Sequence, residues 1–400
     1  MWAGFFLGLA ELTKTTWLIL YVLWPVQWVI FRIFQHRSLK FRVAQESLQV
    51  AAILVLSIYV LNLGYCFSGS FKRLGDYQFV SRTLAGEAPP HAKSLFGNRF
   101  AGSWLGRVPV PLPEDYVAGV DLQRSDFDNR MWSYLNGEWR LGGWWYYYLF
   151  ALAIKVPVGG LLLLALAFAV SLWHNSPLRM SLDELCLLLP FISILGLVSS
   201  QTGFNHHIRY VLPIFPFAFI FISKLARSIE LRQTSTALIA CAALLWFITS
   251  SLYVFPHSLC YYNEIIGGPK RGHYYLGNSN TDWGQDLFYL RDWTAAHPQA
   301  VPLYVATDLP FVSPAILGIR SQPLPPDGLS PGIVNQRGWF AISVNQLHRM
   351  DGRFKSFLSI EPVDRAGYTI NIYHLTTNDV KNLRRATESA TQTDERTGKE

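Results

Sequence analysis

Residues 236–255 (TALIACAALLWFITSSLYVF) decide the fold, because this stretch of 20 residues contains no charged side chain. A helix of this length crosses the roughly 30 Å of hydrocarbon in a bilayer. In hydrocarbon the main chain has to satisfy its own hydrogen bonds. We therefore expect the stretch to be a membrane-spanning helix.

Further apolar segments have a similar composition, and they cover residues 16–34, 48–67, 144–173, 185–199 and 210–222. Residues 2–12 are apolar as well, but they are too few to span a bilayer by themselves. Half of the 400 residues are hydrophobic and only 15% are charged, whereas soluble domains carry about 25% charged residues. This composition excludes a disordered chain or a nucleic-acid-binding tail. We predict a polytopic α-helical membrane protein whose residues 1–255 form a transmembrane domain of six or seven spans.

Two basic clusters lie beside these segments, and they are Arg32, Arg37, Lys40 and Arg42, and then Lys224, Arg227 and Arg232. Loops rich in lysine and arginine remain on the cytoplasmic side. The alternation of spans then places residues 68–143, 200–209 and everything after residue 256 on the outer face. The sequence also lacks an N-x-S/T glycosylation sequon, which favours a multi-pass protein of a bacterial cytoplasmic membrane.

The outer loop 68–143 is too long to be a simple connector, and loops of this length are often functional. Its run 108–113 (VPVPLP) should be extended, because each proline biases the preceding residue away from helix. The loop ends at an aromatic belt, residues 144–148 (WWYYY), of the kind found at membrane interfaces. We expect Glu114, Asp115, Trp144, Trp145 and Tyr147 to contact a lipid or an acceptor.

The composition changes after residue 256. Short strands are predicted at 304–306, 339–344 and 368–373, each bounded by proline, glycine or aspartate. Helical spacing from Trp283 to Thr294 predicts a helix capped by Asp282. These elements indicate a small extracytoplasmic α/β domain over 256–377, and the polar segment 378–400 is predicted to be a disordered tail.

Two lysines lie at or inside apolar segments, where a charge is costly and often functional. Lys14 separates two apolar runs at the predicted outer boundary. Lys155 has apolar neighbours on both sides, and Pro157 should kink its helix and free a carbonyl there. Each lysine is either an interfacial residue that reaches the headgroups or part of an anion-binding site.

Residues 205–210 (NHHIRY) place His207 and Arg209 at the outer end of a predicted span. Guanidinium groups bind phosphate oxygens in bidentate fashion, so the segment suits a phosphate. A zinc site is the rival interpretation, but adjacent histidines without a nearby carboxylate indicate it only weakly. An interfacial charge cluster is the third interpretation.

Acid–base chemistry requires carboxylates as well. Asp282 and Asp286 would share one helix face, and the interpretation we favour for them is a helix cap followed by a solvated first-turn acid. Motifs typical of soluble enzymes, such as a phosphate-cradling glycine loop or an H-E-x-x-H helix, are absent from the sequence. We therefore predict no metal and no cofactor.

Several stretches, in their order along the chain, resemble one family of membrane enzymes. They are residues 8–14 (GLAELTK), 143–148 (GWWYYY) leading to 155–157 (KVP), 205–213 (NHHIRYVLP), 261–269 (YYNEIIGGP) and 278–287 (NSNTDWGQDL). Together they are similar to the later part of a GT-C membrane glycosyltransferase of the family 39, or dolichyl-phosphate-mannose protein mannosyltransferase, type. Bacterial members are the closest in character.

The resemblance implies that a sugar is transferred, with inversion and without an essential metal, from a polyprenyl-phosphate sugar to an acceptor on the outer face. The acceptor is a glycan, a protein or a lipid, and nucleic acid is not expected as a partner. Lys14, Lys155, His207 and Arg209 are the expected donor-phosphate ligands, because cations at the membrane boundary stabilise a leaving phosphate.

The family's catalytic acidic residue lies in a first outer loop that this sequence does not contain, so no catalytic residue is carried over. The expectation is therefore either an N-terminally truncated enzyme or a non-catalytic GT-C relative that binds polyprenyl lipid or assists a partner transferase. A transporter or flippase for anionic lipids would also need basic residues in the membrane. Such a protein more often has repeated halves, and none are visible.

Overall fold

The structure is a computed structural model that describes residues 1–34, 40–86, 96–128, 130–173, 180–307, 313–322, 324 and 337–381. The predicted cytoplasmic residue Arg37 lies outside these ranges. The chain divides into two compact units. The first contains residues 1–133, 141–149 and 163–240, and the second contains residues 134–140, 150–162 and 241–400.

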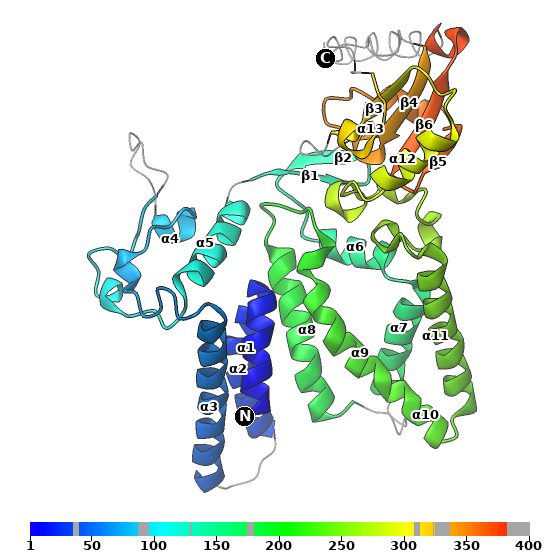
Figure 1. The fold of residues 1–400 in the computed structure, drawn as a ribbon. Helices are drawn as coiled ribbons and strands as arrows, with labels where there is room; N and C mark the ends of the chain where they lie inside the picture. The colour runs from blue at the N-terminus through cyan, green and yellow to red at the C-terminus, as the bar shows by residue number, and fades with distance from the viewer. Residues whose placement is uncertain are drawn as a thin grey trace, which may run out of the picture. The chain divides into compact units, whose positions relative to one another are not determined.

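A series of helices, most of them apolar, runs through the first 254 residues (Figure 1). Their bounds are α1 (Trp2–Thr13), α2 (Leu20–Phe34), α3 (Lys40–Gly64), α6 (Tyr147–Lys155), α7 (Val158–Leu172), α8 (Leu182–Ser200), α9 (Phe215–Ser223), α10 (Arg227–Glu230) and α11 (Thr234–Val254). In the described ranges, the segments long and apolar enough to cross a membrane are Thr15–Ile33, Val43–Gly64, Leu182–Ser200, Ile208–Glu230 and Thr234–Val254. These 5 segments, or 6 if the bent pair α6 and α7 forms one span, confirm the predicted helical protein with several candidate membrane spans.

Two glycines allow α1 to pack closely along α3 in the first unit. Gly4 and Gly8 are one helical turn apart. A Cβ at Gly8 would lie 2.6 Å from Val60 Cβ and 2.7 Å from the carbonyl oxygen of Ser57. Small residues at this spacing let membrane helices approach each other. The backbone of the short helix α1 therefore packs directly against the longer helix α3.

The chain bends by 112° between α6 and α7, where Pro157 lies. Asn263 binds three carbonyl groups that immediately precede Pro157. Its main-chain N–H donates to Ile154 O at 2.8 Å. Its side-chain amide donates to Ala153 O at 2.6 Å and to Val156 O at 3.1 Å. The predicted kink at Pro157 and the freed carbonyls are therefore confirmed.

The long loop 68–143 contains the helices α4 (Arg82–Ala85) and α5 (Glu114–Asp128). The buried carboxylate of Asp121 on α5 accepts hydrogen bonds from the main-chain N–H groups of Val80 and Ser81, at 2.7 and 3.1 Å. The proline-rich run is extended as predicted, and Pro109 forms an antiparallel β-bridge with Arg73. Asp121 is therefore a structural residue that joins two parts of the loop.

The same loop also contains a hairpin of β1 (Trp132–Leu135) and β2 (Glu138–Leu141). Its turn residues Asn136 and Gly137 have φ values of 51° and 85°, which is the backbone conformation that an Asn-Gly hairpin turn requires. The hairpin tip belongs to the second unit, where Asn136 N donates to Tyr275 O at 2.8 Å. The sequence analysis did not predict this hairpin, although the Asn-Gly pair is its usual signal.

The second unit contains a four-stranded mixed sheet of β3 (Leu303–Ala306), β4 (Gly338–Ser343), β5 (Asp364–Ala366) and β6 (Ile370–Leu375), in the order β3-β4-β6-β5 (Figure 1). β3 and β4 are parallel and the other pairs are antiparallel. Neighbouring strand residues point to opposite faces. Phe340 and Tyr373 therefore join one buried cluster, and Ala341 and Ile372 join the other. The predicted C-terminal sheet is confirmed, with β5 as a strand that was not foreseen.

The helix of this unit, α12 (Leu287–Ala296), begins four residues later than the predicted helix, which had Trp283 as its first residue. Asp282 does not cap it, because Asp282 Oδ1 accepts from Gly284 N at 2.7 Å and its other oxygen accepts from Ser343. Gly284 has a φ of 75°, which is incompatible with a helix at that position. The predicted helix start and cap were wrong for these local reasons.

Residues 377–381 are helical, and Val380 packs in the cluster that contains Phe340. These first residues of the predicted tail therefore belong to the folded unit. The rest of that prediction, residues 382–400, lies outside the described residues.

Candidate functional site

Lys14 lies where α1 ends in the first unit. It has extended backbone angles, φ −163° and ψ 127°, and a short 3-10 helix (Thr15–Ile19) follows it. Its Nζ donates to the main-chain carbonyl oxygen of Arg209 and lies 5.5 Å from the centre of the Tyr210 ring. Burial, and after it the nearby Arg209 charge, lowers the pKa of Lys14 to about 8. The ammonium group therefore still carries its charge at neutral pH.

The segment before Arg209 is fixed by hydrogen bonds within the same unit. The buried Asn205 donates its main-chain N–H to Ser133 Oγ at 2.9 Å and accepts from the main-chain N–H of Trp144 at 2.6 Å. His206 Nε2 lies 3.0 Å from the carbonyl oxygen of Trp132. These contacts make His206 a structural residue and hold the next residues, His207 and Arg209, in place.

His207, Arg209 and Tyr210 form a cluster with Lys14. The ring of His207 is 5.6 Å from that of Tyr210, and the guanidinium carbon of Arg209 is 5.8 Å from the same ring. Burial, followed by the Arg209 charge, lowers the pKa of His207 to about 4, so its imidazole is neutral at pH 7. The cluster thus offers two cations and a neutral imidazole, which suits an anion with several oxygen atoms.

The helix α5 of the long loop contacts the same part of the first unit. Thr15 Oγ1 donates to Gln123 Oε1 at 2.6 Å, and the rings of Phe127 and Tyr210 are 5.9 Å apart. Sequence reasoning predicted a functional loop but did not find these contacts, because no local pattern indicates them.

A third contact of α5 involves Glu11, which the sequence analysis did not select. Glu11 is 2% exposed, and its Oε2 accepts from the Tyr116 hydroxyl at 2.7 Å. Within the described residues, Glu11 Oε1 has no hydrogen-bond partner. The sequence feature that could have identified Glu11 is that it is a lone carboxylate in an otherwise apolar helix.

The loop residues selected from the sequence have different environments. Glu114 is paired with Lys72, whereas Asp115 is exposed. Trp144 and Tyr147 are buried at 7% and 1% exposure, and Trp145 is 65% exposed. Of the three aromatic residues, only Trp145 therefore presents most of its side chain to a lipid or an acceptor.

Lys155 belongs to the second unit and is held by main-chain oxygens. Its Nζ donates to Leu259 O at 2.7 Å and to Asn280 O at 2.6 Å, and it lies 4.1 Å from the centre of the Tyr262 ring. An ammonium group has three N–H donors, so one remains for a further acceptor. Among the predicted phosphate ligands, Lys14, His207 and Arg209 come together in one unit, and Lys155 has its own environment in the other.

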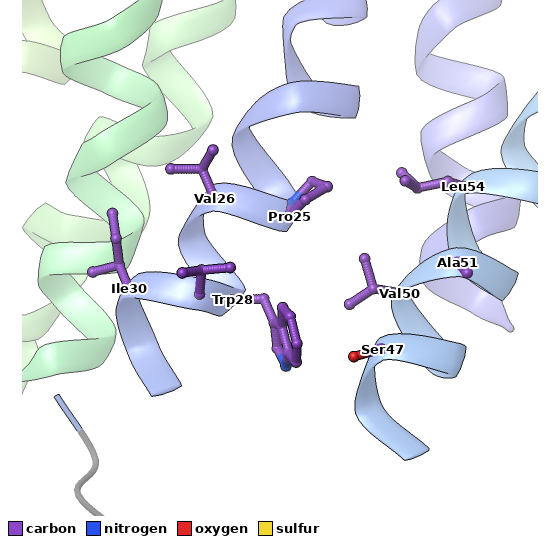
Figure 2. Close-up of a pocket in the computed structure, with 9 residues that line it drawn as sticks. Pro25, Val26, Trp28, Ile30, Ser47, Val50, Ala51 and Leu54 are labelled. Atoms are coloured by element: carbon purple, nitrogen blue, oxygen red, sulfur yellow. The ribbon is translucent and has the colours of Figure 1, made fainter. Parts of the chain in front are cut away.

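An apolar cavity of about 460 Å³ lies between α2 and α3 of the first unit. Figure 2 shows Pro25 and Trp28 from α2 on one side and Val50 and Leu54 from α3 on the other. Ser47 is the polar side chain in its lining. Such a lining suits a hydrocarbon chain better than a sugar.

No group of three or more His, Cys, Asp or Glu side chains within the described ranges could hold a metal ion. No protein-family model, curated protein or solved structure matches this chain. The functional assignment therefore depends on the chemistry of the residues.

Proposed function

We propose that this protein is a membrane glycosyltransferase that moves a sugar from a polyprenyl-phosphate sugar to a glycan, protein or lipid acceptor on the outer face of the membrane. One observation carries the proposal. Lys14 and Arg209, which are 195 residues apart in the sequence, lie together beside segments that are apolar enough to span a membrane. A lipid-linked phosphate has its charge at that boundary and its tail in the hydrocarbon.

The proposed chemistry depends on charge stabilisation. When the bond between the anomeric carbon and the phosphate oxygen breaks, negative charge accumulates on the phosphate. Fixed cations stabilise that charge because they need no reorganisation during the reaction. Lys14 and Arg209 take this role in the proposal, and neutral His207 donates or accepts a hydrogen bond. Lys155 belongs to the other unit, so the proposal gives it no role at this site.

A non-catalytic polyprenyl-lipid binder is the second candidate. It is favoured by the environments of two loop carboxylates, because Glu114 is paired with Lys72 and Asp121 holds main-chain N–H groups. Neither carboxylate is free to remove a proton from an acceptor.

The test is to incubate the purified protein with a detergent extract of its native membrane and to measure released polyprenyl monophosphate by mass spectrometry. We expect release above that of the extract alone, and a loss of that release in Arg209→Ala. The control is Arg227→Ala, which removes an exposed arginine near the other end of the same candidate span. Binding of undecaprenyl phosphate without any release would support the non-catalytic alternative, and absence of both would contradict the proposal.

A further inference from the structure

The helix α5 packs beside the Lys14 and Arg209 site of the first unit through one of its faces. The three residues that make these contacts are Tyr116, Gln123 and Phe127. Spacings of seven and four residues bring side chains to the same side of an α-helix. Their partners are Glu11, Thr15 and Tyr210, and the last two directly follow Lys14 and Arg209 in the chain.

Asp126 belongs to the turn of α5 between Gln123 and Phe127. Successive side chains of an α-helix are rotated by about 100°, so the Asp126 side chain leaves α5 on one flank of the contacting face. Arg124 and Asp128 leave the helix on the other flank, where they form an ion pair at 3.1 Å. The contacts of Gln123 and Phe127 thus fix the backbone on both sides of Asp126.

The Asp126 carboxylate is close enough to Tyr210 for an electrostatic interaction. The charges of Asp126 and Arg209 act with opposite sign on the Tyr210 hydroxyl. The ring of the same tyrosine is 5.5 Å from Lys14 Nζ and 5.8 Å from the guanidinium carbon of Arg209. One tyrosine therefore has the two proposed phosphate ligands and a carboxylate around it, all in the first unit.

Asp126 differs from the other carboxylates of the long loop that have partners. Glu114, Asp121 and Asp128 are each held by a cation or by main-chain N–H groups. Among the described residues, the Asp126 side chain forms no hydrogen bond and no ion pair, and the residue is partly exposed. Its oxygens are therefore available to accept a proton from a bound molecule.

We propose that Asp126 is the general base of the transfer reaction. This inference rests on the proposed function. The oxygen of the acceptor hydroxyl forms a bond to the anomeric carbon, and the bond from that carbon to the phosphate oxygen breaks with its electron pair on the phosphate. The hydroxyl proton moves to a carboxylate oxygen of Asp126 and later leaves to water.

The position of Asp126 beside the cations, without contact to them, fits this step. In a displacement with inversion, the attacking hydroxyl and the departing phosphate lie on opposite sides of the anomeric carbon. The base has to reach the hydroxyl, and a carboxylate bound to the cations would compete with the phosphate. Within the described ranges, Asp126 forms no ion pair with Lys14 or Arg209, so both cations remain available to the donor.

The experiment measures two quantities for the purified protein, namely release of polyprenyl monophosphate from the native membrane extract and binding of undecaprenyl phosphate. We expect Asp126→Asn to lower the release rate by about 100-fold or more, because general bases contribute about 10²- to 10⁴-fold. Its affinity for undecaprenyl phosphate should not fall, since the substitution removes no phosphate ligand. A residue that only organised the site would affect binding as well.

A chemical rescue tests the role of the carboxylate itself. Added formate should restore part of the release rate of Asp126→Ala, because a small carboxylate accepts the proton in place of the missing side chain. Asp76→Asn is the matched control, since Asp76 is an exposed acidic residue of the same loop, and it should leave the rate unchanged. Thermal unfolding of each variant reports on folding, and Asp126→Ala replaces Asp126→Asn if the latter does not fold.

The outcomes separate the two proposals. Equal release by the wild type and by a folded Asp126 variant overturns the base role and leaves the transferase proposal intact. Loss of both release and undecaprenyl phosphate binding in Asp126→Asn also overturns the base role, because Asp126 would then organise the phosphate site. A wild-type protein that releases no polyprenyl phosphate contradicts the transferase proposal itself, and the base role then fails with it.

Discussion

The side chain of Lys14 donates a hydrogen bond to the main-chain carbonyl of Arg209, 195 residues further along the chain. The contact joins the end of α1 to the start of the candidate span Ile208–Glu230. It brings two cations to the edge of apolar segments, which is the arrangement that a lipid-linked phosphate requires.

The proposed phosphate site should lose affinity at alkaline pH. The pKa of Lys14 is lowered to about 8, so its charge is present below pH 8 and is lost above it. A phosphomonoester is already fully ionised there, since its second pKa is about 6. Undecaprenyl phosphate should therefore bind more weakly at pH 9 than at pH 7, as measured by titration in detergent. Lys14→Arg should remove this pH dependence because arginine keeps its charge, and an identical fall in that variant would exclude Lys14 as the cause.

The contact between Glu11 and Tyr116 should show strong coupling in a double-mutant cycle. Tyr116→Phe leaves the buried carboxyl group without its donor, and it should cost about 1 to 3 kcal/mol of stability. Glu11→Leu combined with Tyr116→Phe should recover much of this loss, since replacing both partners by apolar groups is close to neutral. Thermal unfolding of the four proteins measures the coupling. Additive effects of the two changes would mean that the hydrogen bond does not contribute.

The packing of α1 on α3 should depend on Gly8. Gly8→Ala places a Cβ 2.6 Å from Val60 Cβ, and we expect a loss of about 1 to 3 kcal/mol from overpacking. Gly196→Ala on α8 is the control, because a Cβ there meets nothing within 4 Å. It should be neutral or stabilise the helix by up to about 1 kcal/mol. The same effect from both substitutions would contradict the close approach at Gly8.

The second unit should lose stability in acid through a buried histidine pair. Tyr134 OH donates to Tyr274 O at 3.1 Å and therefore accepts from His348 Nδ1 at 3.1 Å. His348 Nε2 then accepts from His273 Nδ1 at 2.8 Å. Burial, and after it the charge of His348, lowers the pKa of His273 to about 3. Burial lowers the pKa of His348 to about 4.

An unfolded histidine has a pKa of about 6.5, so the unfolded chain binds more protons than the folded one below that value. The contribution of these two histidines to stability should be constant above pH 7 and fall below pH 6.5, by up to about 1.4 kcal/mol per pH unit for each histidine. The melting temperature measured between pH 7.5 and 5 checks this, and His348→Gln should flatten the curve. A wild-type melting temperature that does not change over this range would contradict lowered pKa values for His273 and His348 in the folded protein.

The sequence predicted the membrane helices well because each apolar run is a local property. The bend at Pro157 was predictable for the same reason, since proline acts on its own helix. The partner of the freed carbonyls, Asn263, was not predictable, because it is more than 100 residues away and no local pattern indicates that contact.

Asp286 shows where local rules fail. Its position in the first turn of the predicted helix indicated a solvated acid, but the fold buries it against Thr369 and His257. Contacts with residues that are distant in the sequence determine the environment of Asp286. Glu11 was overlooked for a related reason, since its partner Tyr116 lies on a helix of the long loop.

The affinity of the protein for undecaprenyl phosphate, measured for the wild type, Arg209→Ala and Arg227→Ala, tests the central claim most directly. We expect Arg209→Ala to weaken binding by about 1.5 to 3 kcal/mol, which is roughly 10- to 150-fold, because a charge-assisted hydrogen bond is lost. Arg227→Ala should bind like the wild type. Equal affinity of Arg209→Ala and the wild type would contradict a phosphate site at Lys14 and Arg209.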